Sequence, residues 1–297
     1  MTRSQGASNL SGVLWALAGV GLFAFIYVSG RLSGTEASAL QIIWLRYVGG
    51  FATMVVALLV RRDIVGILST TQPFLHACRA AAGGFGGVAA VFVAGNMPVA
   101  SASAIGLLDG LFTVLLGLIV LREYVPLRQW LATIASLAGA MTVVGAQGAF
   151  SNWDVEYTGP ALIALAGAML IAIESIMIKT LVRTEAALTV LFYVNLFGSM
   201  ILAWLGISSW QTIPFQWLFA FLMLGPVAIL AQCCNINAFR QANASVVGPI
   251  RYAWIIYGSV FGALFFDESI TLPMGIGVCL VLFGGGCLAF LRNRPRL

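Results

Sequence analysis

Long apolar runs repeat along the whole length of this chain. A helix that crosses the ~30 Å hydrocarbon core of a bilayer needs about 20 mostly apolar residues. We expect one membrane-spanning helix in each of ten such runs, near residues 10–30, 38–60, 73–94, 97–121, 127–146, 159–181, 186–207, 214–238, 243–266 and 271–291.

The composition excludes the main alternatives to a membrane protein. Only 8% of the 297 residues are charged and 61% are hydrophobic, whereas a soluble domain carries about 25% charged residues. The chain is therefore neither a soluble enzyme nor a disordered protein. The net charge of +5 forms no basic stripe, so no nucleic-acid partner is expected. We predict an all-α, multi-pass protein of a bacterial inner membrane, with the lipid bilayer as its surroundings.

The charges of the connecting segments orient this protein in the membrane. With both termini in the cytoplasm, the cytoplasmic segments hold eleven of the fifteen basic residues: Arg3, Arg61, Arg62, Arg122, Arg128, Lys179, Arg183, Arg240, Arg292, Arg294 and Arg296. The outer segments hold only Arg31, and the membrane holds Arg46, Arg79 and Arg251. This asymmetry follows the positive-inside rule and supports ten spans.

The two halves of the chain form an inverted repeat. Residues 1–146 and 159–297 each hold five of the expected spans, and a polar linker, 147–158, joins them. At an offset of 145 residues, Gly117 meets Gly262, Glu123 meets Glu268, Leu127 meets Leu272 and Gly139 meets Gly284. Because each half has an odd number of spans, the halves are inserted in opposite orientations. Such repeats enclose a central site in secondary transporters.

These features resemble the drug/metabolite transporter superfamily, and within it the EamA family. The residues that carry the resemblance are Arg46 within WLRYVGG, Ala100 to Ala104, Leu121 to Tyr124, Gln129-Trp130 and Gly139, with Ala244 to Pro249, Phe266 to Glu268 and Gly284 in the second half. The resemblance implies ten helices, a central cavity between the halves, and often the export of amino acids or other metabolites.

Four ionisable residues within the spans are the main candidates for function, because each costs about 2.5–3.5 kcal/mol at the centre of a spanning helix. Counting from the span ends places Asp109 and Arg46 at similar depth in the first half, and Glu174 and Arg251 in the second. We expect Arg46 to face Asp109 and Arg251 to face Glu174. Two interpretations of each pair are open: its charges only neutralise each other within the membrane, or the pair contacts substrate. Asp109 and Glu174 are also possible proton carriers.

Other charged residues in the membrane have a simpler interpretation. His76 and Arg79 lie within two turns of a span end and are expected to extend toward the headgroups. Lys179 and Arg240 lie at inner ends of spans and are expected to serve as orientation charges.

Aromatic and amide residues of the spans extend the list of possible substrate contacts. Spacing places Arg251, Trp254 and Tyr257 near one face of a helix, as in a cavity wall for a flat or cationic ligand. Further candidates for the wall are Trp44, Tyr47, Tyr193 and Asn195. Interfacial belts and interhelical bonds are the competing interpretation. Gly248-Pro249 predicts a helix break beside Arg251, and Ala104 at the matching position suggests that the break is one-sided.

No cofactor or metal is expected. The five cysteines form no C-x-x-C pair, His76 is the only histidine, and no phosphate-binding G-x-x-x-x-G-K-[ST] motif is present.

We therefore predict a secondary transporter of small organic metabolites, with export of amino acids or related compounds as the first expectation. It would work by alternating access, coupled to protons or to an exchanged metabolite, as a monomer or homodimer. A facilitator or exchanger for a vitamin or nucleotide-like compound is the first alternative. A channel and an intramembrane enzyme are more distant alternatives.

Overall fold

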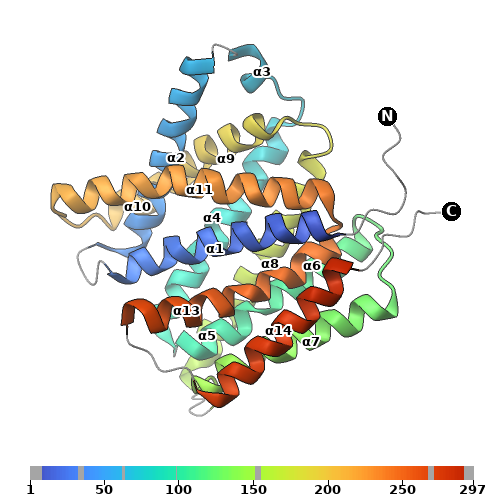
Figure 1. The fold of residues 1–297 in the computed structure, drawn as a ribbon. Coiled ribbons are helices and arrows are strands. Elements are labelled where there is room, and N and C mark those ends of the chain that lie inside the picture. Colours follow the sequence, from blue (N-terminus) through green and yellow to red (C-terminus); the bar gives the residue numbers. More distant parts are fainter. Residues whose placement is uncertain are drawn as a thin grey trace.

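The fold consists of helices that follow the apolar runs of the sequence (Figure 1). A computed structural model describes residues 9–32, 37–61, 64–97, 99–150, 155–266 and 271–290. Within these ranges there is no strand. The elements are α1 (Leu10–Leu32), α2 (Ala39–Arg61), α3 (Ile64–Leu68), α4 (Pro73–Asn96), α5 (Val99–Gly106), α6 (Leu108–Ile119), α7 (Leu127–Ala146), η1 (Val155–Tyr157), α8 (Thr158–Leu181), α9 (Ala187–Ile201), α10 (Ala203–Ser208), α11 (Phe215–Gln241), α12 (Ala244–Ile250), η2 (Arg251–Ala253), α13 (Trp254–Phe266) and α14 (Leu272–Phe290).

Each of the ten expected spans coincides with one helix or with a pair of consecutive helices. Within the described residues, seven helices are long and apolar enough to cross a membrane. Leu10–Ile26 and Ala187–Ile201 are shorter apolar helices, and α12 and α13 are separated by the 3-10 turn η2. The structure confirms an all-helical, multi-span membrane protein, while the total of ten spans stays a prediction.

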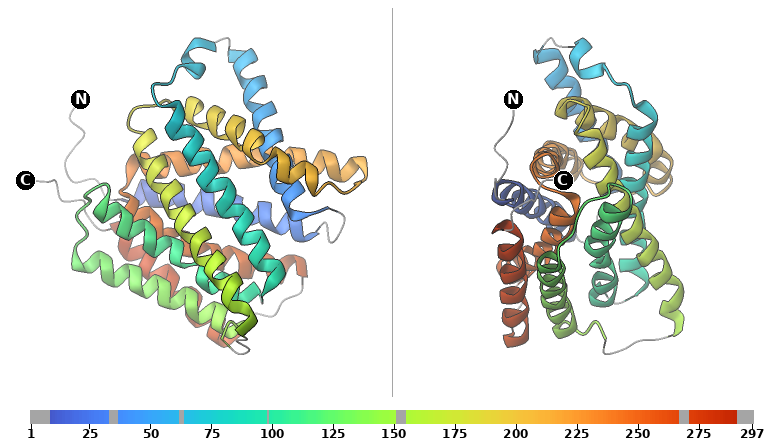
Figure 2. Two further views of the ribbon diagram at one scale, coloured as in Figure 1. Left: turned by 180° about the vertical axis from the view of Figure 1, so that it is seen from behind. Right: turned by 90° about the vertical axis from the view of Figure 1, so that its right-hand side faces the viewer.

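Contacts between helices relate the two halves by an approximate two-fold axis. α4 packs on α8, as its counterpart α11 packs on α1, and α2 packs on α11, as α9 packs on α4. The pairs α2–α9 and α7–α14 join equivalent helices, and α6–α12 joins the fourth expected span to the ninth. Figure 2 shows α4 beside α8 and α7 beside α14 from two further directions. The molecule is therefore built from two repeated halves.

The α7–α14 contact fixes the register of the repeat. A Cβ atom on Gly139 would lie 2.6 Å from the Gly277 carbonyl oxygen and 2.8 Å from the Val281 nitrogen. A Cβ atom on Gly284 would lie 2.6 Å from the Ala132 carbonyl oxygen and 2.9 Å from the Ser136 nitrogen. These neighbours are again 145 residues apart, so the structure reproduces the offset found in the sequence. Small residues let the two backbones touch.

The start of α1 and the end of α14 lie on the same side of the bundle, which we call the terminal side. There the Asn9 side chain donates a hydrogen bond to the Leu288 carbonyl, 3.5 Å away. The predicted ten spans, an even number, agree with this arrangement. Glu268, matched with Glu123 in the sequence, and residues 151–154 of the predicted linker lie outside the described residues.

Candidate functional site

A cavity of about 550 Å³ lies between the two halves. Its wall is formed by α1, α2, α4, α5 and α6 of the first half and by α8, α11, η2 and α13 of the second. Many wall residues come from the later parts of α1 and α4 and the early part of α2, while Glu174 of α8 and the two α11 residues line the deeper end of the cavity. Because successive helices are antiparallel, those parts of α1, α2 and α4 lie away from the terminal side. A volume of this size suits a small organic ligand.

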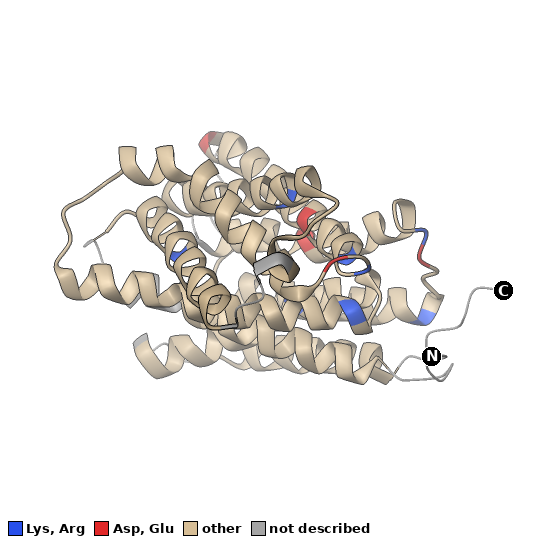
Figure 3. Cartoon of the chain, turned by 90° about the horizontal axis from the view of Figure 1, so that it is seen from above, with Lys and Arg blue, Asp and Glu red and all other residues tan. Residues whose placement is uncertain are grey.

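Four of the wall residues are charged, although charged residues are sparse along the helices (Figure 3). They are Arg46, Asp109, Glu174 and Arg251, the four ionisable candidates found in the sequence. The predicted residues Tyr47 and Trp254 also line the cavity. Six of the ten predicted contact residues therefore share one wall.

Arg251 and Asp109 form an ion pair between the halves. The Arg251 Nη2 atom lies 2.8 Å from Asp109 Oδ2, and the two side chains are 30% and 15% exposed. Arg251 begins η2 directly after the predicted break at Gly248-Pro249, and Asp109 follows the α5–α6 interruption at Leu107. Both halves are thus interrupted beside the pair, so a one-sided break is wrong. In the first half, which has no proline here, Gly110 N–H bonds to the Leu107 carbonyl in 3-10 fashion.

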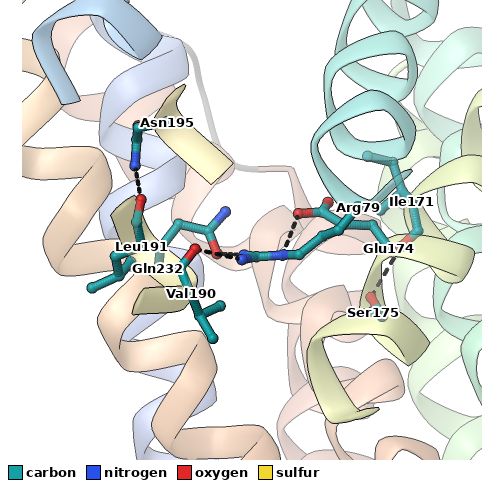
Figure 4. A network of polar contacts seen from close by, with 8 residues as sticks. All are labelled: Arg79, Ile171, Glu174, Ser175, Val190, Leu191, Asn195 and Gln232. Atoms are coloured by element: carbon teal, nitrogen blue, oxygen red, sulfur yellow. Dashed lines mark hydrogen bonds and ion pairs between the residues drawn. The ribbon is translucent and has the colours of Figure 1, made fainter. Parts of the chain in front are cut away.

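Glu174 pairs with Arg79, which links the halves a second time. The Arg79 Nε atom lies 3.7 Å from Glu174 Oε1. On its other side, Arg79 donates hydrogen bonds to the Val190 carbonyl (3.3 Å) and the Gln232 Oε1 atom (3.0 Å). Figure 4 shows the guanidinium between these partners. Gly83 leaves room for the carboxylate, since a Cβ atom there would lie 2.7 Å from the Glu174 Cδ atom.

The pairing predicted from the sequence is therefore wrong. Arg251 reaches Asp109 because α12 packs on α6. Arg46 instead places its guanidinium carbon 4.5 Å from the centre of the Tyr47 ring. Counting along the spans gives the height of a side chain but not the direction in which it leaves the helix, so equal depth does not identify the partner.

Two residues expected to extend toward the headgroups are fully buried. Arg79 and His76 are both 0% exposed. The His76 ring stacks on Tyr193, with centroids 5.0 Å apart, and Arg79 forms the polar network described above. Packing of α9 against α4 covers this side of the helix, so neither side chain is free to reach the membrane surface.

Four of the predicted contact residues do not line the cavity. Three of them use their polar group between helices: Tyr257 donates to the Leu17 carbonyl, Tyr193 to the Leu68 carbonyl and Trp44 to the Ser199 carbonyl. Asn195 donates to the Leu191 carbonyl of its own helix, α9. These bonds satisfy polar groups within the bundle. The helical spacing that joined Tyr257 to Arg251 fails because η2 changes the helical repeat between them.

Three polar residues at the site were not among the predicted contact residues. Gln232 and Asn235 line the cavity from α11, and Arg79 supports Glu174. The available signal was a pair of amides three residues apart in the middle of an apolar run. Across the described residues, no three His, Cys, Asp or Glu side chains come close enough together to hold a metal ion.

Polar contacts close the terminal side of the bundle, one set between the halves and one within the second half. The Glu123 carboxylate accepts hydrogen bonds from the backbone N–H groups of Ala244 and Ser245, both at 2.9 Å. Lys179 was expected to be an orientation charge, but its Nζ atom donates to the Phe239 and Ala242 carbonyls at 2.5 Å. One charge therefore caps the start of α12 and the other the end of α11. The cavity lies on the opposite side of this closed layer.

Three curated proteins are similar to this chain over most of their length. The S-adenosylmethionine uptake transporter of Rickettsia prowazekii is 23% identical, with 87% of this chain and 85% of the relative aligned. The pseudopaline exporter of Pseudomonas aeruginosa is 24% identical, with 96% and 97% aligned. The riboflavin transporter of Brucella anthropi is 24% identical, with 91% and 95% aligned.

A solved crystal structure has the same fold, with a TM-score of 0.80 at 20% identity, covering 96% of this chain and 98% of that one. The model of the EamA-like transporter family matches residues 10–145 and 159–289, one match for each half of the fold. This chain therefore belongs to the EamA-like transporter family and is a membrane transporter of the drug/metabolite type.

Proposed function

We propose that the protein is a secondary transporter that moves a small organic metabolite through the central cavity by alternating access of its two halves. The observation that carries this proposal is the placement of the charges. Each ion pair of the cavity, Arg251–Asp109 and Arg79–Glu174, joins one half to the other. A movement of one half against the other must therefore change both pairs at the place where a ligand would lie.

The closed terminal side supports the same mechanism. Glu123 and Lys179 bond to backbone groups around the α11–α12 connection, while the cavity lies on the other side. This is the arrangement expected of one end state of an alternating-access cycle. With both termini in the cytoplasm, as the loop charges favour, the cavity would face outward.

The substrate that we expected from the sequence is an amino acid or a related metabolite. A vitamin or nucleotide-like compound is the second candidate, and two observations favour it. A volume of about 550 Å³ accommodates such a compound. Two relatives are named for S-adenosylmethionine and riboflavin, although a third is named for pseudopaline.

Proton coupling is part of the proposal, with Asp109 as the proton carrier. Its carboxylate is 15% exposed and bonded to Arg251 across the halves. Protonation would remove one charge of that pair and weaken the link between η2 and α6. Glu174 is the second possible proton carrier, since it is the carboxylate of the other ion pair, with Arg79.

The test is counterflow in proteoliposomes. Purified protein is reconstituted in vesicles loaded with a metabolite extract, an isotope-labelled extract is added outside, and the accumulated compounds are identified by mass spectrometry. We expect labelled metabolites to accumulate above the level of protein-free vesicles. If no compound accumulates under any imposed ion gradient, the protein is not a metabolite carrier.

A further inference from the structure

The charges around the cavity do not balance. Three guanidinium groups lie at the cavity, those of Arg46 and Arg251 in its wall and that of Arg79 behind Glu174. They face two carboxylates, Asp109 and Glu174, and each carboxylate is already engaged by one arginine. Among the residues that the structure describes, one positive charge is left over, and it belongs to Arg46.

Arg46 differs from the other two arginines in its surroundings. In the part of the chain that the structure describes, no carboxylate lies within ion-pair distance of it. Its guanidinium stands over the Tyr47 ring, at 4.5 Å from the centroid, and borders the cavity. A cation–π contact orients the planar group, and a side-chain hydrogen bond to Tyr47 uses only part of its five N–H donors.

We infer that Arg46 binds a carboxylate of the transported metabolite, an assignment that rests on the proposed transport function and narrows its substrate class. Arginine holds a carboxylate with two parallel N–H···O bonds, and such charge-assisted bonds are the strong ones. A single excess charge matches one carboxylate. A phosphate monoester carries about −1.5 to −2 at neutral pH and would leave the cavity overcompensated.

The charge balance also limits the rest of the ligand. An ammonium group would add a positive charge to a cavity whose two carboxylates are each already paired with an arginine. The ligand is therefore an organic monoacid without a compensating cation, rather than a free amino acid. Its body would lie against the aliphatic wall and the Trp254 ring. This differs from the zwitterion that the sequence suggested.

Binding to the protein in lipid nanodiscs tests this assignment with two matched probes. Indole-3-acetate and indole-3-acetamide have nearly the same shape and differ in charge. We expect wild-type protein to bind the acetate about tenfold or more tightly than the amide. Arg46→Gln should abolish this preference and Arg46→Lys should retain part of it. Arg240→Gln is the control variant, because Arg240 lies outside the cavity and donates to the Glu185 carbonyl.

Two results would overturn the assignment. The first is that the wild type binds both probes equally or binds neither. The second is that the preference for indole-3-acetate over indole-3-acetamide persists in Arg46→Gln. Size-exclusion profiles and melting temperatures without probe establish that the variants are folded. Counterflow separates this inference from the proposed function. Accumulation of metabolites that carry no carboxylate would refute the role of Arg46 while leaving transport intact, whereas no accumulation of any metabolite would refute transport.

Discussion

Replacing Glu123 by glutamine should loosen the closed terminal side of the bundle. Glu123 is 7% exposed, and its two oxygens accept the N–H groups of Ala244 and Ser245 at 2.9 Å each. Asn243, the N-cap residue of α12, makes no side-chain capping bond, so the Glu123 carboxylate from the other half caps the helix instead. Glutamine has one oxygen and would present an N–H₂ group to the second backbone N–H.

The expected loss follows from these contacts. A hydrogen bond to a charged group contributes about 1.5–3 kcal/mol, and a buried donor left without an acceptor costs about 1–3 kcal/mol. The negative charge at a helix N-terminus contributes about 0.3–1 kcal/mol more. Because these terms overlap, we expect a total near 2–4 kcal/mol. The lower value corresponds to about a 30-fold change in the local opening equilibrium.

Hydrogen exchange measured by mass spectrometry reports this change directly. A peptide covering the start of α12 contains the amides of Ala244 and Ser245, and it should exchange about 30-fold or more faster in Glu123→Gln. Glu185→Gln is a matched control on the same side, because its carboxylate accepts bonds from Thr70 and Thr71 instead. Exchange at the start of α12 that is unchanged in Glu123→Gln, or equally faster in Glu185→Gln, would refute this reasoning.

Three further changes test the packing, the second ion pair and the coupling. Gly277→Ala should lower stability by about 1–3 kcal/mol, because its Cβ atom would lie 2.5 Å from the Gly139 carbonyl oxygen. Gly275→Ala on the same helix should leave stability unchanged, because a Cβ atom there would have no neighbour within 4 Å. Equal melting temperatures of the two variants would contradict this prediction. Arg79→Met should lower stability by about 3–5 kcal/mol, because it leaves Glu174 unpaired. Adding Glu174→Gln to that variant should restore much of the lost stability, as measured by thermal unfolding. Asp109→Asn should transport without responding to a pH gradient that drives the wild type; a wild type indifferent to that gradient would exclude coupling through Asp109.

The sequence alone determined the class of the protein and the framework of the site. Apolar runs of bilayer length predict the helices, since backbone groups in lipid must bond within their own segment. The 145-residue offset predicted the repeat, and the Gly139 and Gly284 contacts obey it. Charges inside spans also marked the cavity, because so costly a group is kept where it has a partner or a ligand.

Only the tertiary structure decided which side chains meet. The spans are apolar around most of their circumference, as in α13 and α14, because lipid-facing and core-facing positions are both hydrophobic. The pattern that shows the inward face of a soluble helix is therefore absent. The orientation of each element about its own axis decides these contacts. It places Arg46 of α2 on the Tyr47 ring, Arg79 of α4 beside Glu174, and Arg251 of η2 beside Asp109. These orientations arise from contacts between helices far apart in the chain, where small residues allow close approach.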